Sequence, residues 1–263
     1  MKNTLHSHPV ALVTGANKGI GFETAKGLLA HGFTVLIGAR NFENGVIAAK
    51  TLSTPPHSAQ ALTPQALALQ LDVTDSASIA TAAQRIRSEY GRLDVLVNNA
   101  GISHPGTPGL SFADVMQTNL LTATPFDDVR AVWETNVFGV IAVTQAMLPL
   151  LREAPAARIV NMGSSGGSLN LNSDPANPHR AMFGNYSASK SAAHAITLAF
   201  ALALESTKIK VNIACPGHTA TALNNFSGAR SAEQGARRAV ELALLDETGP
   251  TGSFSDENGS VAW

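Results

Sequence analysis

The segment that most constrains the fold is a glycine-rich turn near the start of this 263-residue chain. The apolar run Val10-Ala11-Leu12-Val13 predicts a buried parallel strand, and it leads directly into Gly15-Ala16-Asn17-Lys18-Gly19-Ile20-Gly21. A helical pattern follows the turn. Glycines let backbone amides approach a ligand closely, and the first turn of a helix favours negative charge. Strand, glycine turn and helix in this order predict a dinucleotide-binding site.

Strands and helices alternate to the end of the chain. Predicted strands are Val10–Thr14, Thr34–Gly38, Ala66–Leu71, Val95–Asn98, Ile159–Met162, Val211–Ala214 and Ser253–Phe254. Predicted helices are Gly19–His31, Phe42–Leu52, Ser76–Tyr90 (capped by Asp75), Asp127–Arg152, Asn185–Glu205 and Ala232–Leu245. We expect a single α/β domain over residues 1–263, a doubly wound Rossmann-type fold with helices on both faces. Its seven-stranded parallel sheet should have the order 3-2-1-4-5-6-7, with ligands at the carboxyl ends.

Composition excludes several classes of protein. The net charge is −1 and no basic stripe is visible, which argues against nucleic-acid binding. No stretch approaches ~20 uninterrupted apolar residues, and the N-terminus has no apolar leader, so neither a membrane nor secretion is expected. The single cysteine, Cys215, suits a reducing cytoplasm and is interpreted as a small buried hydrophobe. The eight histidines lack ligand spacing, and no metal is predicted.

A second informative feature is a tyrosine four residues before a lysine. Tyr186 and Lys190 share one face of a predicted helix. A phenol titrates near pH ~10, and a neighbouring ammonium favours the phenolate, so we expect Lys190 to lower the pKa of Tyr186. The pair therefore predicts acid–base chemistry. His194, on the same helix, is interpreted as a packed or polar-surface residue.

Together with this pair, the glycine spacing G-x-x-x-G-x-G makes the chain resemble the short-chain dehydrogenase/reductase family, in its single-domain, carbonyl reductase-like branch. The resemblance runs from about Val10 to Trp263. Further matches are Leu71-Asp72-Val73, Asn98-Asn99-Ala100-Gly101, Asn136, Asn161-Met162-Gly163-Ser164-Ser165 and Cys215-Pro216-Gly217. The resemblance implies an enzyme, an NADP(H)-dependent oxidoreductase acting on CH-OH or carbonyl groups.

The resemblance also implies catalytic roles. Tyr186 donates a proton, Lys190 keeps its pKa low and holds a ribose hydroxyl, and Ser164 holds the substrate oxygen. Asn136 is unusual inside an apolar helix, and the family explanation is a kink that feeds a proton relay. Gly163 stands where a serine is common and Ser165 follows directly. The register therefore favours Ser164 but leaves Ser165 open.

Matching positions give a predicted cofactor site. It comprises Gly15, Asn17, Lys18, Gly19, Ile20, Gly21, Arg40, Asp72, Val73, Asn99, Ala100, Gly101, Tyr186, Lys190, Pro216, Gly217, Thr219 and Thr221. The second strand is followed by Arg40 where a carboxylate would hold the ribose of NAD. Arg40 and Lys18 suit a 2′-phosphate instead. We therefore predict NADPH/NADP+ as the cofactor, in preference to NADH.

Three long connections are expected at Thr51–Pro64, Ile102–Pro125 and Ser168–Gly184. Long loops in compact domains are often functional. The third begins beside Ser164, so we hypothesise that residues 168–184 select the substrate.

The sequence favours reduction of a small-molecule aldehyde or ketone to an alcohol. Two alternatives stay open: oxidation of a secondary alcohol, and a non-catalytic NADP(H)-binding sensor. An alanine-rich helix at Asn185–Glu205 permits close packing between subunits, which leaves homodimer, homotetramer and monomer open. The sequence does not identify the substrate.

Overall fold

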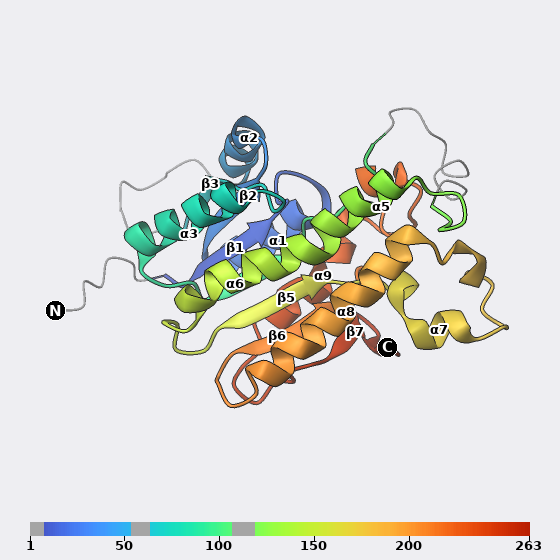
Figure 1. Cartoon of the computed structure of the whole chain (residues 1–263). Coiled ribbons are helices and arrows are strands. Elements are labelled where there is room, and N and C mark those ends of the chain that lie inside the picture. Colours follow the sequence, from blue (N-terminus) through green and yellow to red (C-terminus); the bar gives the residue numbers. More distant parts are fainter. Residues whose placement is uncertain (1–7, 54–63, 107–118) are drawn as a thin grey trace.

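The computed structural model describes residues 8–53, 64–106 and 119–263 (Figure 1). Its centre is one sheet with the strand order β3-β2-β1-β4-β5-β6-β7-β8. The strands are β1 (Val10–Thr14), β2 (Thr34–Ala39), β3 (Ala66–Gln70), β4 (Val95–Asn98), β5 (Arg158–Met162), β6 (Lys210–Ala214), β7 (Phe254–Asp256) and β8 (Gly259–Ser260). The predicted doubly wound fold and the order of its seven strands are confirmed.

The sheet differs from the prediction at its last strand. β8 pairs antiparallel with β7, whereas all other neighbouring strands pair in parallel. The sheet is therefore eight-stranded and not wholly parallel. A strand of two exposed residues gives no alternating pattern, which is why the sequence did not indicate it.

Helices cover both faces of the sheet. They are α1 (Gly19–Ala30), α2 (Phe42–Leu52), α3 (Ser76–Tyr90), α5 (Phe126–Trp133), α6 (Gly139–Leu151), α7 (Leu169–Ser173), α8 (Asn185–Ala203) and α9 (Ala232–Ala243). α1, α2 and α9 lie on one face, and α3, α6 and α8 lie on the other (Figure 1). The predicted cap of α3 is confirmed, since Asp75 Oδ1 accepts the Ala77 N–H at 2.9 Å.

Each face of the sheet has its own core, because successive side chains of a strand point to opposite faces. In β1, Leu12 belongs to the core under α3, α6 and α8, whereas Val13 belongs to the core under α1, α2 and α9. Every residue of β1 is buried. This burial explains the continuous apolar run in the sequence.

The helical stretch Phe126–Leu151 is long and apolar enough to cross a membrane by length and composition alone, and half of its most apolar window is buried inside the protein. Val143, Met147 and Leu150 pack in the core shared with α3 and β4. The apolar composition of this stretch therefore matches its place in the core.

The predicted substrate loop is partly helical. Residues 168–184 contain α7 and a 3₁₀ turn at Arg180–Met182, so the expectation of an irregular connection is corrected here. The stretch projects from the end of the molecule at which α5 and α8 begin (Figure 1). Of the other two long connections, residues 54–63 and 107–118 lie outside the described residues.

Candidate active site

The glycine-rich turn leaves room for a ligand at the start of α1. Gly15 and Gly19 have φ values of 63° and 59°, which lie in the left-handed region that favours glycine. A Cβ at Gly21 would lie only 2.7 Å from the carbonyl oxygen of Gly15. Lys18 is the N-cap of α1, and its side chain makes no capping hydrogen bond to the amides of the first turn. These amides and the helix dipole fit the pyrophosphate of a dinucleotide.

Asn99 braces this turn from the neighbouring strand end. Its Nδ2 donates to the carbonyl oxygens of Thr14 at 2.8 Å and Gly15 at 3.2 Å. The backbone N–H groups of Asn99 and Ala100 both donate to Thr14 Oγ1 at 3.0 Å. Within the turn, Ile20 packs against the core. The predicted residues after β4 therefore support the shape of the turn.

Asn98 has a different role from its neighbour. Its Nδ2 donates to Thr144 Oγ1 at 3.0 Å and to Asn161 Oδ1 at 2.8 Å, and Asn161 in turn donates to Thr197 Oγ1 at 2.8 Å. This buried chain of hydrogen bonds connects α6, β4, β5 and α8. It fixes the elements that carry the catalytic candidates relative to one another.

The two predicted phosphate-binding cations, Lys18 and Arg40, are exposed. Neither forms a side-chain hydrogen bond or ion pair within residues 8–53, 64–106 and 119–263. Asp72 Oδ1 accepts hydrogen bonds from the Thr74 N–H at 2.9 Å and the Thr74 hydroxyl at 2.7 Å. One oxygen of Asp72 therefore caps a turn, and Val73 beside it packs against Gly139.

Asn136 lies in a π-helical segment, Glu134–Phe138, between α5 and α6. A π turn interrupts the regular α-helical hydrogen bonds, so the helix is irregular at the position where the kink was predicted. Asn136 Oδ1 accepts the Ile102 N–H at 2.9 Å, and its Nδ2 donates to the Ile102 carbonyl at 2.8 Å and to Ser189 Oγ at 3.0 Å. Asn136 thus connects the loop after β4 to α8.

Gly101 permits the close approach of the two halves of the site. A Cβ at this position would lie 3.2 Å from Asn136 Oδ1 and 3.6 Å from Lys190 Nζ. The cofactor-supporting loop and the catalytic helix therefore meet at Gly101.

Tyr186 and Lys190 lie one turn apart on α8, as predicted. Lys190 Nζ donates to the Met162 carbonyl at 2.8 Å and lies 5.8 Å from the centre of the Tyr186 ring. Burial lowers the pKa of Lys190 to about 8. The ammonium is therefore held between the end of β5 and the tyrosine.

The expected lowering of the Tyr186 pKa is wrong for the protein alone. Loss of solvent raises the pKa of Tyr186 to about 12, Cys215 raises it as well, and a hydrogen bond with Ser164 lowers it. Desolvation disfavours the phenolate more than the neighbouring groups favour it. Tyr186 is consequently a protonated phenol at neutral pH.

Ser164, and not Ser165, is the serine beside Tyr186. The hydrogen bond that lowers the Tyr186 pKa comes from Ser164, whose Oγ also accepts the Gly166 N–H at 3.1 Å. Ser165 is exposed, and its backbone N–H donates to Cys215 Sγ at 3.2 Å. Cys215 is buried, as interpreted from the sequence, but it lies within the site rather than in a remote core.

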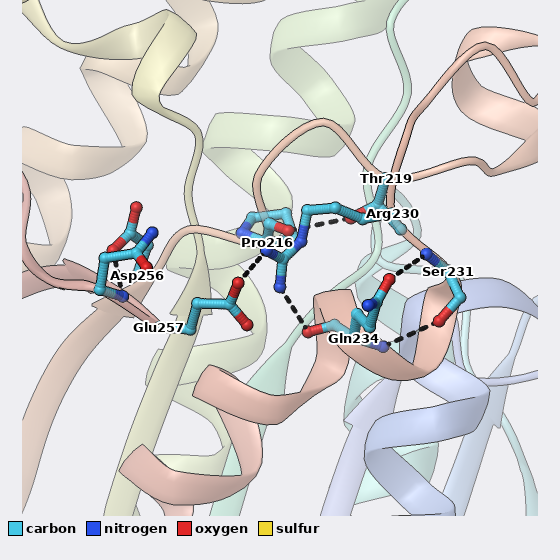
Figure 2. Close-up of polar contacts among 8 residues, drawn as sticks. Pro216, Thr219, Arg230, Ser231, Gln234, Asp256 and Glu257 are labelled. Atoms are coloured by element: carbon cyan, nitrogen blue, oxygen red, sulfur yellow. Dashed lines mark hydrogen bonds and ion pairs between the residues drawn. The ribbon is translucent and has the colours of Figure 1, made fainter.

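The loop after β6 closes one side of the site. Gly217 has a φ of 68°, and Thr219 Oγ1 donates to the Pro216 carbonyl at 2.9 Å (Figure 2). The hydroxyl of Thr219 is therefore used within the loop. Thr221 faces the glycine-rich turn, since a Cβ at Gly19 would lie 3.7 Å from its Cγ2.

Arg230 holds the far end of this loop. Its guanidinium pairs with Glu257 and donates to the Gln234 carbonyl at 3.0 Å (Figure 2). Its backbone bridges back to Thr219. The loop that carries Thr219 and Thr221 is thus anchored to both α9 and the C-terminal hairpin.

Asn119 is a positioning residue that sequence reasoning missed. Its Oδ1 accepts the Tyr186 N–H at 2.8 Å, and its carbonyl accepts the Asn185 N–H at 2.7 Å. It thereby caps α8, whose own N-cap residue is Gly184. A Cβ at Gly184 would lie 2.1 Å from the Asn119 carbonyl oxygen. No local signal predicts a cap that comes from so far along the chain.

Ser189 is a second missed residue. Its hydroxyl accepts from Asn136 and donates to the Tyr186 carbonyl at 2.7 Å. It therefore links the π-helical segment to the turn of α8 that carries the tyrosine. Its place between Tyr186 and Lys190 in the sequence was the available signal.

A glycine cradle at the start of α1 and a Ser–Tyr–Lys group at the carboxyl ends of a doubly wound sheet define a dinucleotide-binding oxidoreductase. The chain belongs to the short chain dehydrogenase family, whose sequence profile matches residues 9–232.

Similar proteins support this assignment. The chain is 37% identical over 241 residues to the short-chain dehydrogenase anuI of Penicillium roqueforti, covering 89% of this chain and 88% of that protein. It is 31% identical to (-)-isopiperitenone reductase of Mentha piperita, covering 96% and 97%. The structure of salutaridine reductase from Papaver somniferum superposes with a TM-score of 0.76 at 29% identity, covering 94% of this chain and 99% of that one. At the family level, the protein acts on carbonyl or hydroxyl groups with a nicotinamide cofactor.

Proposed function

We propose that this protein uses NADPH to reduce an aldehyde or ketone to the corresponding alcohol, with Tyr186 as the proton donor. The observation that carries the proposal is the grouping of three side chains: Tyr186 is hydrogen-bonded with Ser164, and Lys190 Nζ lies 5.8 Å from the centre of the Tyr186 ring. A proton donor must hold its proton at the working pH, and a phenol in this environment does so. The relatives named as reductases point in the same direction.

The residues divide the work between orientation and proton transfer. Bound NADPH would supply the hydride. Ser164 and Tyr186 donate to the carbonyl oxygen of the substrate, and Tyr186 then transfers its proton to that oxygen. Lys190 would hold a ribose hydroxyl of the bound cofactor. Asn136 would connect the proton relay to solvent. Ser189 accepts from Asn136 at 3.0 Å and donates to the Tyr186 carbonyl, so it holds Asn136 against α8.

The preference for NADPH rests on charge. Lys18 and Arg40 are exposed, and neither has an ionic partner in the parts of the chain that the structure describes. Unpaired cations beside the predicted ribose position attract a 2′-phosphate, and the position directly after β2, where a carboxylate would hold a free hydroxyl, is Arg40.

The test follows the absorbance of NADPH over a panel of aldehydes, ketones and quinones, with NADH run in parallel. We expect turnover with NADPH and a loss of ~10²–10⁴-fold in Tyr186→Phe, because general acid catalysis is removed. Tyr90→Phe is the matched control, since the chain has only these two tyrosines and Tyr90 is the last residue of α3.

Activity retained in Tyr186→Phe would refute the assigned proton donor. Turnover with NADH at the same efficiency would refute the cofactor preference. If NADPH binds but no compound in a broad panel is reduced, the result would favour a non-catalytic NADP(H)-binding sensor over a reductase.

A further inference from the structure

His194 is a buried titratable residue that the proposed mechanism does not use. It lies on α8 one turn beyond Lys190 and is only 3% exposed. Its Nε2 is 3.3 Å from the backbone nitrogen of Ser164 and accepts the N–H of that residue. A buried side chain therefore contacts the backbone of the proposed catalytic serine directly.

Two aromatic side chains hold the imidazole ring in place. The ring centre of Phe254 lies 4.4 Å from that of His194, and the ring centre of Trp263 lies 6.4 Å away in an edge-on arrangement. The carbonyl of Trp263 accepts the Asn170 N–H at 2.7 Å. The same cluster thus joins the C-terminal segment, α7 and the serine.

Gly163 is matched to this histidine. A Cβ at Gly163 would lie 2.8 Å from His194 Nε2 and 2.3 Å from Ile213 Cγ2. A side chain at residue 163 would meet both Ile213 and the imidazole. The presence of glycine before Ser164, which the sequence left unexplained, then has a physical reason.

The charge state of the imidazole agrees with its role as an acceptor. Burial, together with the positive charge of Lys190, lowers the pKa of His194 to about 4. A neutral imidazole has one nitrogen that accepts and one that donates. Since the backbone N–H of Ser164 must donate, Nε2 is the unprotonated nitrogen and Nδ1 carries the hydrogen.

We propose that His194 is a positioning residue for Ser164, and that His194 and Gly163 form an interdependent pair that aims the serine hydroxyl at Tyr186. This inference rests on the proposed function only for the part that concerns turnover. The hydrogen bond from Ser164 fixes the turn that follows β5, where Ser164 Oγ also accepts the Gly166 N–H. Without the His194 acceptor, the turn after β5 becomes more mobile, whereas the glycine-rich turn at the start of α1 does not change.

The first test compares His194→Phe, which keeps an aromatic ring against Phe254 but cannot accept, with His194→Asn, which keeps an acceptor. We expect kcat to fall by about 10-fold in His194→Phe, the effect of one lost hydrogen bond, and to be partly restored in His194→Asn. NADPH affinity, measured by fluorescence titration, should stay within about twofold. His31→Phe, at the end of α1, is the matched control.

The second test exploits the interdependence of the pair. Gly163→Ser should lower kcat strongly when His194 is present, because the new side chain meets the imidazole. In the His194→Ala protein the same change should lower kcat by a smaller factor, because only the contact with Ile213 Cγ2 remains. Equal effects of Gly163→Ser in both backgrounds would overturn the pairing.

A third readout requires no turnover. Long-range ¹H–¹⁵N NMR of the imidazole should show hydrogen on Nδ1, and amide exchange at Ser164 should accelerate in His194→Phe but not in His31→Phe. Hydrogen on Nε2, or an unchanged exchange rate, would overturn the positioning role. If the unaltered protein reduces nothing, the proposed function fails while these NMR results still decide the role of His194.

Discussion

The cofactor half and the catalytic half of the site are built in different ways. Around β1 and α1, the shape comes from backbone: positive φ values at Gly15 and Gly19, and a Cβ-free position at Gly21. Around β5, α8 and β6, the shape comes from buried side chains such as Lys190 and His194. The first half is determined locally, and the second half depends on contacts between distant segments.

This difference has a consequence for electrostatics. Lys18 and Arg40 are exposed and keep their charge in water. Lys190 and His194 are buried and Tyr186 is half-buried. Loss of solvent raises the pKa of Tyr186 and lowers the pKa of Lys190 and His194, which favours the neutral form of each group. We therefore expect mutations in the cofactor half to change binding, and mutations or pH changes in the catalytic half to change turnover.

The largest effect on the cofactor half is expected from Gly21→Ala. The new Cβ would meet the Gly15 carbonyl oxygen, which is backbone and cannot move without opening the turn. NADPH affinity, measured by fluorescence titration, should fall by ~100-fold, the scale of a misplacement of ~1 Å. Gly45→Ala in α2 is the control, because a Cβ there would come no closer than 3.2 Å to Ala39 Cβ and 3.6 Å to the Ile37 carbonyl oxygen. Wild-type affinity in Gly21→Ala would contradict the backbone-built cradle.

Arg40→Asp tests whether exposed charge chooses the cofactor. The substitution removes a charge-assisted contact to the 2′-phosphate and adds a repulsive carboxylate, so the ratio of kcat/KM for NADPH over NADH should fall by ~10–100-fold. Arg87→Asp, an equal change of charge on the exposed face of α3, should leave the ratio unchanged. An unaltered ratio in Arg40→Asp would mean that another residue reads the phosphate.

The pH profile tests the catalytic half. Because burial lowers the pKa of Lys190 to about 8, this side chain is charged below that pH and loses its proton above it. Tyr186, with a pKa of about 12, stays protonated throughout. The rate of reduction should fall ~10-fold for each unit above pH 8, and Lys190→Arg should abolish this fall because arginine stays charged. A flat profile from pH 7 to 10 would show that the charge of Lys190 is not needed.

The smallest effect is expected from residues 168–184, which lie beyond both halves. Replacing the exposed stretch 174–179 with a glycine–serine linker should change the relative kcat/KM of different carbonyl compounds by ~3-fold or more, with unchanged NADPH affinity. The same linker at exposed residues 205–207 is the control. Unchanged substrate preference would refute the hypothesis that this segment selects the substrate.

Much of the fold and of the cofactor site could be predicted because their signals are local. The alternation of apolar runs with helical patterns predicted the strand order, and helical spacing placed Tyr186 and Lys190 on one face. The family resemblance implied an irregular helix at Asn136, and the structure has a π-helical segment there. The Tyr–Lys pair and Asn136 are local signals, whereas the strand order follows from the general rules for chains in which strands and helices alternate.

Other parts of the site could not be predicted from the sequence. Asn119 caps α8 from 67 residues away, and His194 accepts from Ser164 across 30 residues. The sequence predicted a lowered pKa for Tyr186, whereas the pKa is raised. The spacing of the two residues reveals the neighbouring ammonium of Lys190, but it does not reveal that Tyr186 loses contact with water. Burial is a property of the packed molecule.

The sequence by itself determined the doubly wound fold, the glycine cradle and the Tyr–Lys pair, since backbone geometry fixes what residues a few positions apart can do. Only the tertiary structure decided that Ser164 is the serine beside Tyr186, that the phenol keeps its proton, and that His194 holds the serine backbone. Hydrogen bonds and desolvation at these positions come from segments that meet only when the two cores pack on the sheet.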